Sequence, residues 1–115
     1  VLQDMAEADA VVFGSPIYFF QLTGQVRLME DRMYSLIDSA FSSRLSPGKK
    51  AVIVTSQGNP DLVSYEKAIT EFAEVLKMLG FEVKDIISMD SGSAKDAALG
   101  RKDLLDKARA TGQSL

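Results

Sequence analysis

The sequence contains neither cysteine nor histidine. Without cysteine, these residues can form no disulfide, no thiolate nucleophile and no cysteine-ligated iron–sulfur cluster. Without histidine, they lack the side chain that most often acts as an acid or base near neutral pH. We therefore predict no catalytic residue and no metal site in this chain, and we expect any chemistry at its site to be supplied by a bound cofactor.

Positive charge and long hydrophobic runs are also scarce. The formal net charge is −3, and the lysines and arginines are scattered, which argues against a nucleic-acid or anionic membrane surface. The longest apolar run, residues 10–13, is too short to span a bilayer, and no basic segment precedes it as in a signal peptide. The length of 115 residues, 46% of them hydrophobic, is typical of one small globular domain. We expect a cytoplasmic location, with small molecules or proteins as partners.

Apolar periodicity predicts alternating helices and strands along the chain. We expect a partial helix at 1–8, a strand at 10–14 buried on both faces, a helix at 24–38, a strand at 50–55, a helix at 60–79, an outer strand at 81–89 and a helix from about 94. Pro16 is expected to force the chain out of regular structure after the first strand. Because the first residue is not methionine and lies within an amphipathic stretch, we interpret the N-terminus as cut or incomplete.

Capping residues set the expected helix ends. Thr23 is the expected N-cap of the second helix. Asn59 as N-cap, with Pro60 at the first helical position, is expected to open the third, and Gly80 to follow its end. The last helix is expected to begin at Ser93. Apolar side chains predicted to face inward are Tyr65, Ile69, Phe72, Leu76 and Leu79 on the third helix, and Leu104, Leu105 and Ala108 on the last.

This order of elements predicts an α/β domain with a parallel sheet and helices on both of its faces. In open sheets of this kind, ligands bind outside the carboxyl ends of the strands. That rule places residues 14–22 and 55–59 on the functional rim.

The first rim loop carries three aromatic residues in a row, Tyr18, Phe19 and Phe20, where an exposed turn is normally polar. Backbone N–H groups beside aromatic faces suit a large flat ring with a hydrogen-bonding edge, such as an isoalloxazine. The alternative is that these side chains pack under the following helix or into a subunit interface.

The second rim loop is short and polar, with Gly58 and Asn59 leading into a helix N-terminus. Free N–H groups and the helix dipole favour an acceptor or an anion there. The alternative is an ordinary strand-to-helix turn, in which Gly58 adopts a positive φ and Asn59 caps the helix. Neither a G-x-G-x-x-G fingerprint nor a P-loop motif occurs in the sequence.

Two motifs carry a resemblance to a known family. They are Ala-Asp-Ala-Val-Val-Phe-Gly-Ser-Pro-Ile-Tyr at 8–18, and Gly24 to Arg27 followed by Asp31-Arg32. Together they closely resemble the NADPH-dependent FMN reductase and iron–sulfur flavoprotein branch of the flavodoxin-like superfamily. Arg27 stands where that family pattern has lysine. The resemblance continues more loosely through residues 52–58 and 79–83, so it covers nearly the whole chain.

The resemblance implies an FMN site at the rim. The cofactor-binding residues that it implies are Ser15, Pro16, Ile17, Tyr18 and Phe19 in the first loop and Thr55, Ser56, Gln57 and Gly58 in the second. It implies hydride transfer from NAD(P)H to FMN, and then electron transfer to a small-molecule or protein acceptor.

The resemblance also implies that residues 1–115 are an incomplete flavodoxin-like domain, a three-layer α/β/α sandwich. In the family strand order 2-1-3-4-5, this chain supplies strands 3, 4 and 5 and lacks the phosphate-binding loop. The strand at 10–14 is then an open edge, and we expect a homo-oligomer, or a separately retained N-terminal piece, to cover it. We expect this chain alone to be inactive and to bind FMN weakly or not at all.

Two other functions remain open from the sequence. One is a flavodoxin-like electron-transfer module without NAD(P)H oxidase activity. The other is a non-catalytic α/β interaction domain whose aromatic loop serves an interface, which the apolar run at 18–20 favours.

Overall fold

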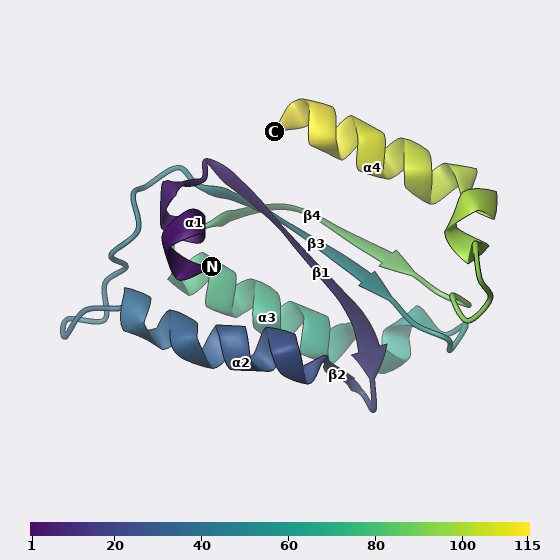
Figure 1. Ribbon diagram of the computed structural model, residues 1–115, viewed down its shortest axis with the longest axis horizontal. Helices are drawn as coiled ribbons and strands as arrows, with labels where there is room; N and C mark the ends of the chain where they lie inside the picture. Colours follow the sequence, from purple (N-terminus) through teal and green to yellow (C-terminus); the bar gives the residue numbers. More distant parts are fainter.

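A computed structural model describes all residues, 1–115, as a sheet with helices on both faces (Figure 1). Its strands are β1 (Ala10–Tyr18), β2 (Gln21–Leu22), β3 (Lys50–Ser56) and β4 (Glu82–Met89). Its α-helices are α1 (Leu2–Glu7), α2 (Gly24–Met33), α3 (Glu66–Met78) and α4 (Lys102–Ser114). Short 3-10 turns lie at η1 (Tyr34–Leu36), η2 (Leu62–Tyr65) and η3 (Ala97–Gly100). No helix is long and apolar enough to cross a membrane.

The sheet has the strand order β2-β1-β3-β4. β1 pairs in parallel with β3, and β3 pairs in parallel with β4, which confirms the predicted parallel arrangement. The two-residue strand β2 was not predicted. It folds back antiparallel on the end of β1 through the pairs Ile17 with Leu22 and Tyr18 with Gln21. Within this chain, the outer edge of β1 has no strand partner from Ala10 to Pro16.

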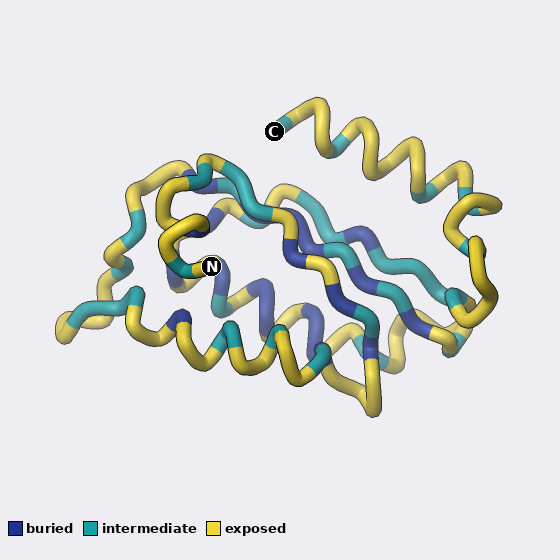
Figure 2. Tube along the Cα trace, in the orientation of Figure 1, coloured by how far each residue is buried: buried dark blue, intermediate teal, exposed yellow.

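The core lies between the sheet and the helices α1, α2 and α3 (Figure 2). Phe13 of β1 meets Phe72 of α3 edge to face, with ring centroids 5.4 Å apart. Phe81, just before β4, packs on Phe13 in the same way at 6.2 Å. Leu76 of α3 is completely buried. The predicted inward stripe of α3 is confirmed, although Tyr65 at its start is only half-buried.

The other face of the sheet is covered only by α4, which contacts β4. The contact is polar: Lys107 forms an ion pair with Asp85 at 3.0 Å, and the Thr111 hydroxyl donates to Asp85 at 2.7 Å. Burial raises the pKa of Asp85, but these hydrogen bonds outweigh it and leave the pKa below its ordinary value. The prediction that Leu105 and Ala108 face inward was wrong, since both are exposed.

β1 differs from its prediction in two ways. It continues through Pro16 to Tyr18, because an edge strand tolerates a proline that a central strand excludes. It is also buried on one face only: Val12 is 59% exposed, and Gly14 is exposed as well. α4 covers β4 and leaves this face of β1 open, so the expected burial on both faces was wrong.

Several helix ends also differ from the prediction. The cap before α3 is Asp61, whose carboxylate accepts from the Val63 N–H, and the chain passes through η2 before α3 begins at Glu66. Asn59 instead accepts from the Asp61 N–H and caps no helix. Gly80 follows α3 with φ +89°, as predicted.

α2 and α4 also differ from what the local sequence pattern predicted. α2 begins after Thr23, as predicted, but the Thr23 side chain makes no capping bond. α2 ends at Met33 and gives way to η1, short of the expected end at 38. The last helix begins at Lys102, eight or so residues later than expected, because the chain turns through a left-handed Asp96 into η3 first.

Candidate functional site

β1 and β3 end side by side at one edge of the sheet. Their parallel register pairs Pro16 with Ser56, the last pair before the strands separate. Tyr18 is the last residue of β1 and Phe19 follows it, and Gln57 and Gly58 follow β3. The two loops predicted from the sequence therefore lie at the same carboxyl edge, as the parallel topology requires.

The β1–β2 turn presents three aromatic side chains. Phe19 and Phe20 occupy its two central positions with φ of +47° and +66°, the left-handed pair that tight hairpins favour. Tyr18 is 63% exposed and Phe19 is 97% exposed. Phe20 meets Tyr65 of η2 edge to face, with centroids 5.4 Å apart. Tyr18 and Phe19 are thus free to contact a ligand or a partner and do not pack under α2.

Ser15 and Ile17 hold this turn from inside. Both side chains are buried. The Ser15 hydroxyl accepts from the Thr23 N–H at 3.1 Å and donates to the Pro16 carbonyl at 2.8 Å, which ties the end of β1 to the start of α2. Of the predicted residues in this loop, Tyr18 and Phe19 therefore offer side chains, Pro16 is half-buried, and Ser15 and Ile17 fix the backbone.

Gln57 fixes the second loop. Its side chain is buried, and its amide nitrogen donates to the carbonyls of Asn59 and Asp61, each at 2.9 Å. Its Oε1 is buried without a hydrogen-bond donor. Thr55, also buried, donates to the Ser88 hydroxyl at 2.9 Å. Of the four predicted residues in this loop, Gly58 is exposed and Ser56 is half-buried. The buried Thr55 and Gln57 therefore hold in place the two residues that a ligand could contact.

A third segment, residues 91–93 after β4, completes the edge and was not predicted as part of the site. The Gly92 N–H donates to the Gln57 carbonyl at 2.8 Å. A Cβ at Gly58 would lie 2.7 Å from Ser93 Oγ, so the two loops pack more closely than side chains normally permit. Gly58 does not adopt a positive φ, so its role is this close approach. Residues 91–93 follow the carboxyl end of β4, and this position in the sequence could have identified them as part of the site.

Arg101, a positive charge at the end of β4, is already paired. Arg101 contacts Asp90 at 2.7 Å and Asp103 at 3.2 Å. The guanidinium holds the pKa of both carboxyls below their ordinary value, and the two carboxylates raise the pKa of Arg101. Arg101 is thus engaged at the end of β4 and serves the local fold.

The edge is an open surface. The five best-defined hollows of the structure are lined by other residues and include none of the nine predicted cofactor-binding residues. A flat ligand resting here would meet Tyr18, Phe19 and Gly58 on one side only. All three follow the carboxyl ends of β1 and β3 at one edge of the sheet. That they bind a cofactor stays a prediction.

Comparison with known proteins identifies the family of the chain. Residues 2–111 match the family described as having the flavodoxin-like fold. No curated protein matches the chain in sequence. Among solved structures, the Trp repressor binding protein from Bacillus subtilis superposes with a TM-score of 0.75 at 18% identity, over 94% of this chain and 71% of its own. An FMN-dependent NADH-azoreductase from Bacillus anthracis, in complex with FMN, superposes with a TM-score of 0.73 at 14% identity, over 97% of this chain and 59% of its own.

A further solved structure has the same fold. It is an NADH:FMN oxidoreductase, with a TM-score of 0.60 at 17% identity, over 96% of this chain and 55% of its own. At these identities the likeness establishes the fold.

Proposed function

Because the chain belongs to the family with the flavodoxin-like fold, we propose that it forms the flavin-ring end of an FMN-dependent oxidoreductase that takes hydride from NAD(P)H. One observation carries this proposal: the ends of β1 and β3 bring Tyr18, Phe19 and Gly58 to the same carboxyl edge. Similarity in fold to an FMN-dependent NADH-azoreductase and an NADH:FMN oxidoreductase supports the same reading.

The chemistry of these loops fits a flavin. An isoalloxazine ring has broad apolar faces and a pyrimidine edge that carries both N–H and carbonyl groups. Tyr18 and Phe19 offer exposed aromatic faces, and Gln57 Oε1 is a buried acceptor that lacks a donor. A buried acceptor without a donor costs about 1–3 kcal/mol, so a ligand N–H reaching it would be favourable.

Protein groups in this site would bind and orient. FMN, when bound, would supply the hydride-accepting group, as cofactors do in such enzymes. Tyr18 and Phe19 would cover the ring and keep water from one face. The bond between Ser15 and Thr23 would hold the first loop in a fixed conformation, and the two bonds from Gln57 would do the same for the second, since each bond holds a backbone group. No side chain here is assigned a proton-transfer role.

Titration with FMN tests the proposal. We expect weak binding, seen as shifts of the amide resonances of Tyr18, Phe19 and Gly58 at millimolar FMN and as quenching of flavin fluorescence. Phe19→Asn should weaken binding by about 2- to 10-fold, because one aromatic contact contributes about 0.5–1.5 kcal/mol. Phe41→Asn is the matched control: Phe41 is also exposed with a positive φ, at +58°, but lies away from this edge. Shifts elsewhere, or equal losses for the two variants, would contradict the flavin site.

Steady-state oxidation of NADH and NADPH by the oxidoreductase of which this chain would form the flavin-ring end, with FMN present, separates two versions of the proposal. A reductase consumes the nicotinamide and passes electrons to a quinone, free flavin or protein acceptor. An electron-transfer module of the same fold binds FMN at the same residues but leaves the nicotinamide unoxidised.

One observation favours a second candidate function, a non-catalytic interaction domain. Phe19 is 97% exposed at the tip of a tight turn, beside the exposed Tyr18. Exposed neighbouring apolar side chains are typical of protein interaction sites. A protein that takes up no FMN, yet loses a protein partner on Phe19→Asn, would support this candidate over the first.

A further inference from the structure

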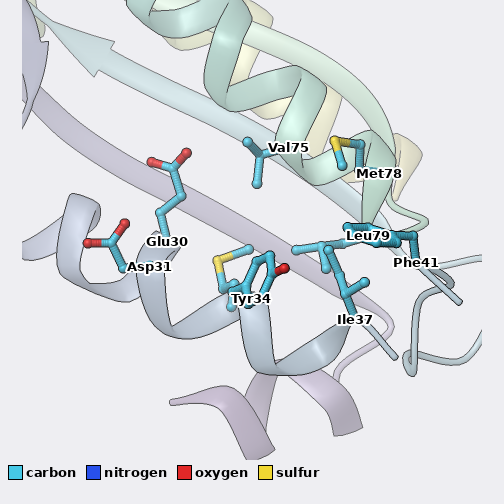
Figure 3. Close-up of a pocket in the computed structure, with 9 residues that line it drawn as sticks. Glu30, Asp31, Tyr34, Ile37, Phe41, Val75, Met78 and Leu79 are labelled. Carbon is cyan, nitrogen blue, oxygen red and sulfur yellow. The ribbon is translucent and has the colours of Figure 1, made fainter. Parts of the chain in front are cut away.

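A hollow lies at the end of the sheet opposite the candidate flavin edge, between α2, η1 and the end of α3 (Figure 3). Its volume is about 390 Å³, and seven of its nine lining residues are hydrophobic. Binding sites for small molecules typically have about 300–1,000 Å³ and mostly apolar walls. The hollow shares no residue with the candidate flavin edge, so its occupant would be a different molecule.

Large apolar side chains stand exposed around this hollow. Tyr34 is 68% exposed, Phe41 is 73% exposed and Met78 is 63% exposed. In Figure 3, Tyr34 and Ile37 lie across the hollow from Val75 and Met78. Three such neighbours in water leave a substantial apolar surface uncovered, which a ligand of matching shape would bury.

A hydrogen-bonded turn holds Phe41 at the hollow. The Asp38 carboxylate accepts from the N–H groups of Ala40 and Ser42, at 2.8 and 2.9 Å, and Ile37 pairs with Ser43 across the turn. Phe41 occupies the left-handed region at φ +58°, which is uncommon for a residue other than glycine. The turn therefore fixes an exposed aromatic ring in a conformation that Asn or Gly would adopt more easily.

The charge at one side of the hollow is negative. Glu30 and Asp31 line it, and none of its nine lining residues is lysine or arginine. Glu30 is paired with Arg27, whereas Asp31 is exposed and makes no ion pair. Asp31 lies one helical turn before Tyr34, so its unpaired carboxylate is close to one exposed aromatic ring. A carboxylate and a ring face both attract positive charge, and this favours a cation.

We propose that this hollow binds a small amphipathic cation, an amine carried on an aromatic or aliphatic body. The body packs against Tyr34, Phe41 and Met78, and the ammonium lies toward Asp31. The proposal does not depend on the flavin site.

Three naphthalene probes of nearly the same shape test it: 1-naphthylmethylammonium, neutral 1-naphthylmethanol and anionic 1-naphthylacetate. In amide-shift titrations of the chain we expect shifts at Tyr34, Phe41 and Met78, and affinity in the order cation, neutral, anion. The cation should bind about 3- to 5-fold more tightly than the neutral probe, as expected for one exposed ion pair, and added salt should reduce that ratio.

Variants separate the two halves of the site. Asp31→Asn should remove the preference for the cation and change the affinity for the neutral probe by less than twofold. Asp9→Asn, which changes another exposed carboxylate that makes no ion pair, should change nothing. Phe41→Asn should lower the affinity for all three probes by about 2- to 10-fold and leave the affinity for FMN unchanged.

Several results would overturn the proposal. The first is an anion that binds as tightly as the cation, and the second is an unchanged preference for the cation in Asp31→Asn. The third is probe shifts that map outside the hollow. The last is a concentration-dependent dimer, seen in sedimentation, whose formation excludes the probes, because the hollow would then be an interface between copies of this chain.

Discussion

Replacing Gln57 by leucine tests whether one buried side chain holds the second loop of the candidate site. In the structure its amide nitrogen donates to the carbonyls of Asn59 and Asp61, at 2.9 Å each. Leucine fills much of the same space and donates nothing. The change therefore removes both bonds and, with them, the unpaired Oε1.

The expected cost follows from these contacts. A hydrogen bond contributes about 0.5–1.5 kcal/mol net, so two lost bonds amount to about 1–3 kcal/mol. Asp61 is exposed and Asn59 is half-buried, so their freed carbonyls can reach water, and the orphaned acceptor disappears. We therefore expect about 1–2 kcal/mol of lost stability, or a Tm lower by about 4–8 °C for a domain of this size.

Thermal unfolding followed by circular dichroism measures the loss, and the amide resonances of Gly58 and Ser93 report the loop. Gln25→Leu is the matched control, since Gln25 is exposed on α2 and should change stability by less than about 0.5 kcal/mol. The variant at Gln57 should also bind FMN more weakly, because the loop loses its fixed position. If Gln57→Leu and Gln25→Leu have the same Tm, and the amide resonances of Gly58 and Ser93 do not shift in Gln57→Leu, then the Gln57 side chain does not hold the loop and the reasoning is refuted.

Three further changes probe the fold. Asp85→Asn should cost about 0.5–1.5 kcal/mol near neutral pH by weakening the contact of α4 with β4. Because the folded pKa of Asp85 is lowered, its contribution is present above its unfolded pKa and is lost as pH falls through the folded value, so urea titrations of wild type and variant should converge in acid. Leu76→Ala, at a fully buried position, should cost about 2–5 kcal/mol in the same assay. Val12→Lys should reduce the self-association that we predict at the open edge of β1, as measured by light scattering.

Each of these changes has a matched control. Asp9→Asn, at an exposed carboxylate without an ion pair, should change stability near neutral pH by less than about 0.5 kcal/mol. A wild-type advantage over Asp85→Asn that persists unchanged in acid would contradict the assignment. Leu28→Ala, at a site 67% exposed, should cost less than about 0.5 kcal/mol. Val63→Lys, at a site 72% exposed away from the edge, should leave the molar mass unchanged. A wild-type chain that stays monomeric at high concentration would count against pairing at β1.

The sequence predicted the sheet better than the helix ends. Runs rich in valine and isoleucine at β1, β3 and β4 identify strands because such side chains favour a pleated, buried surface. The starts of α3 and α4 were wrong although Asn59 and Ser93 have suitable side chains for a cap. Asn59 accepts from the Asp61 N–H, and Asp61 caps the 3-10 turn η2 before α3 begins. After Ser93 the chain passes through a left-handed Asp96 into η3 before α4 begins.

The candidate site was predictable in position and not in orientation. The carboxyl ends of two adjacent parallel strands had to meet, so the two loops followed from the order of elements. Which side chains turn inward did not follow: Thr55 and Gln57 are buried, whereas Tyr18 and Phe19 are exposed. The contribution of residues 91–93 was missed because it arises from packing between loops more than 30 residues apart in sequence, as between Gly58 and Ser93.

By itself, the sequence determined the class of fold, the order of its elements and the absence of thiol and imidazole chemistry, because these depend on composition and on patterns within short segments. Only the tertiary structure decided that β1 runs through Pro16 and that Ser93 packs against Gly58 of the second loop. It also brought Tyr34 of η1 and Met78 of α3 to the same hollow. These features depend on contacts between segments far apart in the chain, whose register and spacing are set only when the sheet and its helices pack together.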